Sequence, residues 1–160
     1  MEAAAWTVPR LKGPVHLRFD GGKVLITPED HPRFLMAAKR AVDVLRQEKL
    51  KDELLRQFND HYLPFLNSWC EGHRSKIKAC YLGTPSSYGL TVFVIGTGRY
   101  DFGLGEEISS FALQLEQEGW PSNILQIPDG DEDDLRTFFD PEDSLQVYAK
   151  IEAASGKGRT

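Results

Sequence analysis

Two aspartates are predicted to lie at one edge of the expected sheet. Asp101 follows the apolar run 90–95 after a short loop, and Asp129 follows a second apolar run, residues 124–127. Because parallel strands end at the same edge, the two carboxylates should lie where α/β sheets bind ligands. A carboxylate pair can hold a divalent cation or act as general acid and base. The candidate catalytic residues are therefore Asp101, Asp129 and Tyr100, and the candidate ligand-binding residues are Thr97, Arg99 and Asp131.

The loop after residues 90–95 contains the beginning of a nucleotide-binding turn. Gly96 and Gly98 follow an apolar run, but Asp101 occupies the position of the third glycine of the dinucleotide-binding fingerprint. The lysine of a phosphate loop is missing, and Glu106 and Glu107 would repel a phosphate at the N-terminus of the next helix. The pattern therefore favours glycines that turn the chain sharply over a phosphate site.

Four side chains are of the types that bind zinc. Cys70 and His73 have the spacing of a ligand pair, but His61 and Cys80 are isolated, whereas structural zinc sites usually have two close pairs. A thiol nucleophile would need an electropositive setting that the sequence does not show. The aspartates of residues 129–134 lack the twelve-residue calcium loop and suit helix capping. Core packing of the cysteines is favoured, Cys70 and His73 remain candidate metal ligands, and no cofactor is expected.

Composition narrows the classes of partner. The chain has 160 residues, 41% of them apolar, which suffices for one domain with a hydrophobic core. Its formal net charge of -5 argues against nucleic acid and anionic lipid as partners. No apolar run reaches the roughly 18 residues of a membrane span, and no secretory signal pattern is present. We expect a cytoplasmic protein with reduced cysteines.

The first half of the chain predicts a hairpin and two helical segments. Residues 15–19 and 24–26 are expected to pair as strands around the turn Asp20-Gly21-Gly22-Lys23. A helix is expected to begin within residues 27–30, with its apolar face starting at Phe34. A second helical pattern runs from Leu50 to Trp69 and should kink or break near His61, because Pro64 lies inside it.

The second half predicts a second hairpin and a βαβ unit. Residues 76–82 alternate, which places Ile77, Ala79 and Tyr81 on one face, and they should pair with residues 90–95. A helix beginning near Gly105 and ending at Gly119 then leads to a strand at residues 124–127, and a short helix is expected over residues 135–139. Residues 144–151 fit either a helix start or an alternating strand, and we predict a strand.

These patterns together predict an α+β fold, with a mixed sheet built from two hairpins and one parallel βαβ unit and with helices packed on the sheet. We expect a loosely ordered arm over residues 1–14, one domain over residues 15–152, and a disordered tail over residues 153–160. Because no catalytic motif is complete, we expect a non-enzymatic binding or regulatory module that acts through a protein partner. The alternative is a small metal-assisted hydrolase with an acidic site at the C-terminal edge of the parallel strands.

Overall fold

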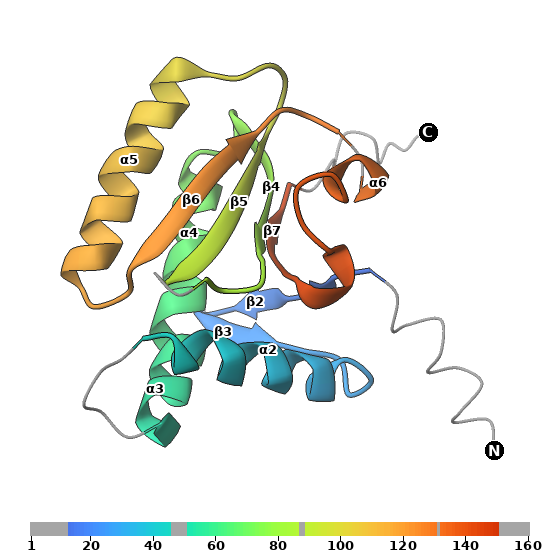
Figure 1. The fold of residues 1–160 in the computed structure, drawn as a ribbon, viewed down its shortest axis with the longest axis vertical. Helices are drawn as coiled ribbons and strands as arrows, with labels where there is room; N and C mark the ends of the chain where they lie inside the picture. Colours follow the sequence, from blue (N-terminus) through green and yellow to red (C-terminus); the bar gives the residue numbers. More distant parts are fainter. Residues whose placement is uncertain (1–12, 46–50, 87–88, 131, 151–160) are drawn as a thin grey trace.

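The computed structural model describes residues 13–45, 51–86, 89–130 and 132–150 (Figure 1). A five-stranded sheet has the order β1-β7-β4-β5-β6, and β2 and β3 form a separate two-stranded sheet. Strand β4 pairs antiparallel with β5 and β7, whereas β1–β7 and β5–β6 are parallel pairs. The strands are β1 (Val15–His16), β2 (Arg18–Asp20), β3 (Lys23–Leu25), β4 (Ile77–Leu82), β5 (Leu90–Gly96), β6 (Ser122–Ile127) and β7 (Leu145–Ala149). The predicted α+β fold is confirmed.

The predicted βαβ unit consists of β5, α5 (Phe102–Gln117) and β6. The two strands pair in parallel without a register shift, from Leu90 opposite Ser122 to Ile95 opposite Ile127. The helix begins at Phe102 rather than near Gly105 as predicted. The reason is its cap: the Asp101 carboxylate accepts a hydrogen bond from the backbone N–H of Leu104 at 2.9 Å, which stabilises an earlier first turn.

The helices before the main sheet are α2 (His31–Asp43), α3 (Lys51–Gln57) and α4 (Leu63–Gly72), with a π-helical turn η1 (Phe58–Tyr62) between α3 and α4. This wide turn is the irregularity predicted near His61, although the chain stays helical from α3 through η1 into α4. Pro64, in the first turn of α4, cannot donate a backbone hydrogen bond to the residue four positions earlier. Helix α2 begins at His31, later than predicted. Residues 27–30 form a turn closed by the bond from Asp30 N–H to the Thr27 carbonyl at 3.0 Å.

The N-terminal strand prediction is wrong in its extent. Residues 15–19 do not form one hairpin arm, because β1 joins the main sheet beside β7 and β2 pairs with β3 in the small sheet. The predicted turn between β2 and β3 is confirmed, and Gly21 and Gly22 have φ angles of 60° and 81° there.

The strand predicted for residues 144–151 is confirmed as β7. The short helix α6 (Glu132–Leu135) overlaps the predicted range 135–139 only at Leu135.

Strand β4 corrects a second prediction. Ile77 belongs to the large core on one face of the sheet, whereas Ala79 and Tyr81 belong to the small core on the other face. The β4–β5 register shifts between Ile77 and Ala79, so simple alternation does not hold across that point. Cys80 joins the large core together with Ile77, on the face opposite Ala79 and Tyr81.

The two faces of the main sheet are covered unequally (Figure 1). Helices α2, α4 and α5 contribute buried side chains to the large core on one face, which also contains Phe58 and Tyr62 of η1. On the other face, residues 128–143 supply Leu135 and Phe139, and the Phe139 ring stacks on Phe93 with centroids 4.4 Å apart. The second face therefore depends on one short segment.

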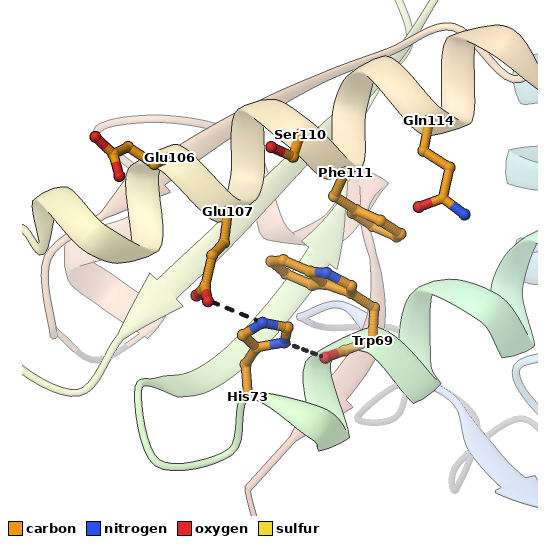
Figure 2. Close-up of a pocket in the computed structure, with 7 residues that line it drawn as sticks. All are labelled: Trp69, His73, Glu106, Glu107, Ser110, Phe111 and Gln114. Carbon is orange, nitrogen blue, oxygen red and sulfur yellow. Dashed lines mark hydrogen bonds and ion pairs between the residues drawn. The ribbon is translucent and has the colours of Figure 1, made fainter.

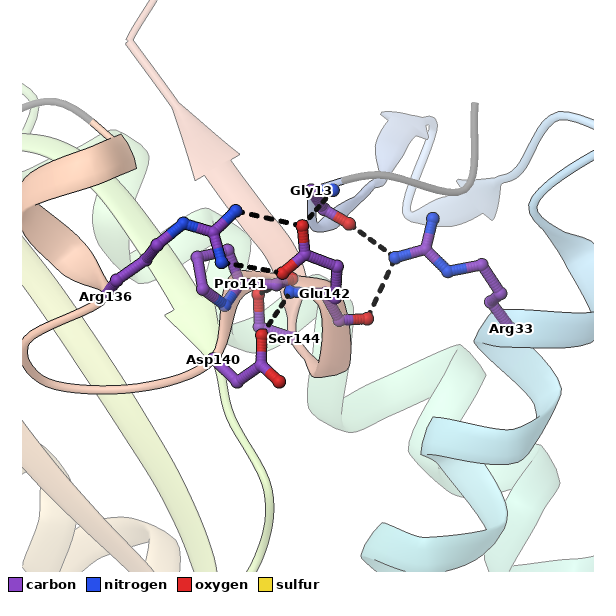
Figure 3. A network of polar contacts seen from close by, with 7 residues as sticks. All are labelled: Gly13, Arg33, Arg136, Asp140, Pro141, Glu142 and Ser144. Atoms are coloured by element: carbon purple, nitrogen blue, oxygen red, sulfur yellow. Dashed lines mark hydrogen bonds and ion pairs between the residues drawn. The ribbon is translucent and has the colours of Figure 1, made fainter. Parts of the chain in front are cut away.

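A polar network ties the β1 end of the sheet to α2 and to the segment before β7 (Figure 3). The Glu142 carboxylate accepts two hydrogen bonds from the Arg136 guanidinium at 2.9 Å each and one from the Gly13 N–H at 3.1 Å. Arg33 of α2 donates to the Glu142 carbonyl at 2.9 Å and to the Gly13 carbonyl. Gly13 and Pro14 belong to the expected N-terminal arm, and residues 1–12 of that arm and the expected tail lie outside the described residues.

Candidate functional site

The predicted aspartates lie in two loops that contact each other at the C-terminal ends of β5 and β6. The Asp101 N–H donates to the side-chain oxygen of Gln126 at 2.7 Å, and the Asp129 N–H donates to the Gly98 carbonyl at 3.0 Å. The β5 loop and the end of β6 are therefore hydrogen-bonded to one another, as parallel pairing predicts.

Both carboxylates already have partners within the chain. The Asp101 carboxylate caps α5, and Asp129 Oδ1 lies 2.7 Å from Lys78 Nζ in an ion pair. Among the described residues, no group of three or more His, Cys, Asp or Glu side chains is placed to hold a metal ion. The Asp101 carboxylate is therefore a helix cap, and the Asp129 carboxylate is half of a surface ion pair. The third predicted aspartate, Asp131, lies outside the described residues.

The other residues predicted at this edge are largely exposed. Tyr100 packs edge-on against Phe102, with ring centroids 5.1 Å apart. The Thr97 hydroxyl is placed to donate to the Ser75 carbonyl at 3.5 Å, and Arg99 is exposed. The Phe102 side chain is 80% exposed, the most exposed large apolar side chain of the described residues. The edge thus presents an aromatic pair and is not an enclosed polar pocket.

The predicted metal ligands are separated by their environments. Cys70 and Cys80 are both fully buried free cysteines in the large core. Burial raises the pKa of the Cys70 thiol well above its usual range, and the neighbouring Cys80 thiol raises it further, which suppresses the thiolate needed for metal binding or nucleophilic attack. His73 instead lies at the C-terminal end of α4 with a partly exposed side chain.

His73 lies beside a cleft between α4 and α5 (Figure 2). Its Nδ1–H donates to the Trp69 carbonyl at 2.8 Å, since a carbonyl oxygen can only accept, and its Nε2 faces a Glu107 carboxylate oxygen at 3.4 Å. The Trp69 ring packs between His73 and Phe111, with centroids 4.3 and 4.4 Å away. The cleft encloses about 410 Å³ and is lined by Trp69, His73, Glu106, Glu107, Ser110, Phe111 and Gln114.

The arrangement in this cleft does not resemble a serine nucleophile with its base. Both ring nitrogens of His73 face partners other than Ser110, so the imidazole has no free nitrogen to accept the Ser110 proton. The contact of His73 with Glu107 joins the end of α4 to the first half of α5. Sequence reasoning missed this pair because the two residues are 34 positions apart and share no motif.

Strand β6 lies at the end of the main sheet. Beyond it the described residues provide no further strand, and Figure 1 shows it between β5 and α5. Five of the six β6 residues are partly or fully exposed, whereas in β5 only Thr91 is partly exposed and the other residues are buried. Leu125 is 43% exposed. The β6 sequence Ser-Asn-Ile-Leu-Gln-Ile contains no charged residue, glycine or proline.

Charge is unevenly distributed along the chain. Residues 100–135, which we term the acidic segment, contain ten of the 24 Asp and Glu residues and no Lys, Arg or His. The rest of the chain has 14 acidic residues against 19 Lys and Arg. The acidic segment includes α5, β6 and α6, and its side chains Glu106, Glu116 and Asp133 are exposed. A composition average conceals this segregation, but a count along the sequence would have found it.

Comparisons with protein-family models, with curated proteins and with solved structures find no match. Among the described residues, no helix combines the length and the apolar character that crossing a membrane requires.

Proposed function

We propose that this chain is a non-enzymatic binding module that holds a protein partner on its acidic segment. The observation that carries the proposal is the charge segregation, with ten acidic residues and no basic residue over residues 100–135. Exposed acidic side chains attract a partner of the opposite charge and repel like-charged molecules such as nucleic acids. The partner surface is therefore expected to be basic.

Exposed apolar side chains on the same segment favour a protein over a simple cation. Four of the eight exposed large apolar residues of the described chain lie within it: Tyr100, Phe102, Leu113 and Leu125. Exposed aromatic and aliphatic side chains beside charged ones are typical of protein interfaces, in which apolar contacts contribute affinity and charges contribute specificity. Metal-assisted hydrolysis receives no comparable support, since the Asp101 and Asp129 carboxylates that would perform it cap a helix and pair with Lys78.

A selection experiment tests this proposal. A display library of random twelve-residue segments is selected against the full chain and, in parallel, against an unrelated acidic protein. We expect sequences rich in Lys or Arg that also contain apolar residues, and we expect them to be retained by this chain and not by the unrelated protein. Equal retention by both proteins, or no basic enrichment, would contradict the proposal.

Charge-neutralising variants locate the binding surface. Replacing Glu106 and Glu116 together by Gln should weaken the selected segments by roughly threefold to tenfold at low salt, because each exposed charge contributes a modest attraction. The matched control replaces Asp52 and Asp60 by Asn, which removes two exposed acids outside the acidic segment. Equal weakening by the two double variants would show that overall charge, and not this segment, attracts the partner.

A further inference from the structure

The contact between His73 and Glu107 in the cleft between α4 and α5 lacks a donor when the imidazole is neutral (Figure 2). Nδ1 carries the proton of the neutral ring, because it contacts the Trp69 carbonyl at 2.8 Å and a carbonyl oxygen can only accept. The neutral ring therefore has only a lone pair at Nε2, and this atom faces a Glu107 carboxylate oxygen at 3.4 Å. Two acceptors thus lie side by side without a donor between them.

The described residues supply no other donor to these two acceptors. The cations that follow His73 in the chain are Arg74 and Lys76, and neither lines the cleft. Arg74 pairs with Glu71 at 3.3 Å, and Lys76 Nζ lies beside Gly103 at the start of α5. A donor from another molecule would satisfy both acceptors at once.

The rest of the cleft suits a planar cation on an apolar stem. The cleft encloses about 410 Å³, and the stacked rings of Trp69 and Phe111 give it apolar surface. Glu106 adds a second carboxylate to the lining, which is turned away from His73 (Figure 2). A guanidinium has five N–H donors in one plane, so it can donate to an imidazole nitrogen and a carboxylate together, whereas an ammonium is a compact point charge.

We propose that this cleft binds an arginine side chain of the basic partner. The guanidinium lies between Nε2 of neutral His73 and the Glu107 carboxylate, and the stem of the arginine packs against Trp69. This inference rests on the proposed function and specifies which part of the acidic segment recognises the partner. It also predicts a preference for arginine over lysine that charge attraction alone does not give.

Binding of this kind depends on the charge of His73. Histidine gains its charge between about pH 8 and pH 5, and the protonated ring donates its own Nε2–H to Glu107 and repels a guanidinium. The other charged groups around the ring are the carboxylates of Glu106 and Glu107 on α5 and the Glu71–Arg74 pair at the end of α4. Carboxylates and guanidinium groups ordinarily keep one charge above about pH 5, so a lower pH should weaken binding through His73.

Two synthetic peptides of equal length and charge test the preference for arginine. Binding of (Gly-Arg)5 and of (Gly-Lys)5 to the full chain is measured by calorimetry at about pH 7.5. We expect (Gly-Arg)5 to bind about fivefold more tightly. It should also shift the indole N–H signal of Trp69 in NMR spectra and leave that of the buried Trp120 unchanged.

A pair of variants removes the same charge inside and outside the cleft. Glu107 and Glu116 are both exposed acids of α5, but only Glu107 lines the cleft. We expect Glu107→Gln to weaken (Gly-Arg)5 by about tenfold, because the new amide can donate to His73 itself, and Glu116→Gln to weaken it by about twofold or less. Thermal unfolding of both variants checks that the fold is kept.

The pH dependence tests the role of His73 separately. The affinity of the wild type for (Gly-Arg)5 should fall about fivefold from about pH 7.5 to about pH 5.5. His73→Phe keeps a ring against Trp69, so it should bind weakly at both values and lose the pH dependence. The other histidines are unchanged in this variant, so the difference isolates His73. An equal fall in both proteins, or no fall in the wild type, would overturn its role.

The peptide results also separate this inference from the proposed function. Equal binding of the two peptides, with equal weakening by Glu107→Gln and Glu116→Gln, overturns the arginine site and leaves the acidic segment as the binding surface. Binding of neither peptide contradicts the proposed function as well. A shift at Trp120 without one at Trp69 would overturn the cleft as the place of binding.

Discussion

The two ends of the main sheet differ in how their charged side chains are arranged. At the β1 end, charged side chains bind one another and the backbone: Glu142 joins Arg136 and Gly13, and Arg33 joins Gly13 and the Glu142 carbonyl (Figure 3). At the β6 end, the strand is uncharged, and the acids around it are exposed. The β1 end is thus closed within the chain, whereas most side chains of β6 remain partly or fully exposed.

The two ends of the main sheet also differ in side-chain burial. Val15 and Leu145, which are opposite each other in the β1–β7 pair, are 2% and 1% exposed, so that pair lies inside the large core. Leu125 is opposite the buried Phe93 in the β5–β6 pair but remains 43% exposed. Substitutions of equal chemistry at the two ends should therefore have unequal effects on stability.

The largest expected effect compares two leucines. Leu145→Ala removes a buried side chain and leaves a cavity, so it should lower the free energy of unfolding by about 3 kcal/mol. Leu125→Ala removes a half-exposed side chain and should cost less than about 1 kcal/mol. Urea denaturation of both variants measures the difference. Equal losses would mean that the β6 end is as closely packed as the β1 end.

A second prediction uses the acid sensitivity of the β1 end. The Arg136 guanidinium, aided by the Gly13 N–H, lowers the pKa of Glu142 from 4.5 to about 2. Because the pKa is lower in the folded state, the resulting stability is complete above about pH 4.5 and is lost as the pH falls toward 2. Glu142→Gln should therefore lower the Tm at pH 7, and its difference from the wild type should shrink between pH 4.5 and 2.

The control for this pH profile is Asp143→Asn, which changes the adjacent exposed carboxylate outside the Arg136 pair. Its Tm should differ little from that of the wild type across the same range. A Glu142→Gln difference that stays constant down to pH 2 would contradict a stabilising role for the ionised carboxylate.

The smallest expected effect on stability is at the acidic segment. Phe102→Ala removes a side chain that is 80% exposed, so the free energy of unfolding should change by no more than about 0.5 kcal/mol. The same change should weaken the binding of the selected basic segments by roughly threefold, because the proposed partner covers part of the ring. Calorimetry on a variant with unchanged thermal unfolding tests this. Unchanged affinity would place the bound peptide away from the start of α5.

The candidate site was partly predictable. Parallel pairing placed Asp101 and Asp129 in adjacent loops, and the hydrogen bonds from Asp101 to Gln126 and from Asp129 to Gly98 agree with that prediction. The partners of the carboxylates were not predictable in the same way. Lys78 is 51 residues from Asp129, and its contact depends on β4, β5 and β6 lying side by side. Short motifs contain no information on such distant pairs.

Local pattern predicted the βαβ unit, the glycine turn between β2 and β3 and the irregularity before Pro64, because hydrophobic period and backbone freedom act over a few residues. At residues 144–151 the local pattern fitted either a helix start or a strand, and pairing with β1 and β4 gives the strand β7. Tertiary pairing decided that residues 15–19 are divided between two sheets and that a register shift moves Ile77 to the large core. It also decided which strand lies at the end of the sheet. The sequence alone shows that residues 122–127 are uncharged. That they form the last strand of the sheet follows only from the order in which the strands pair.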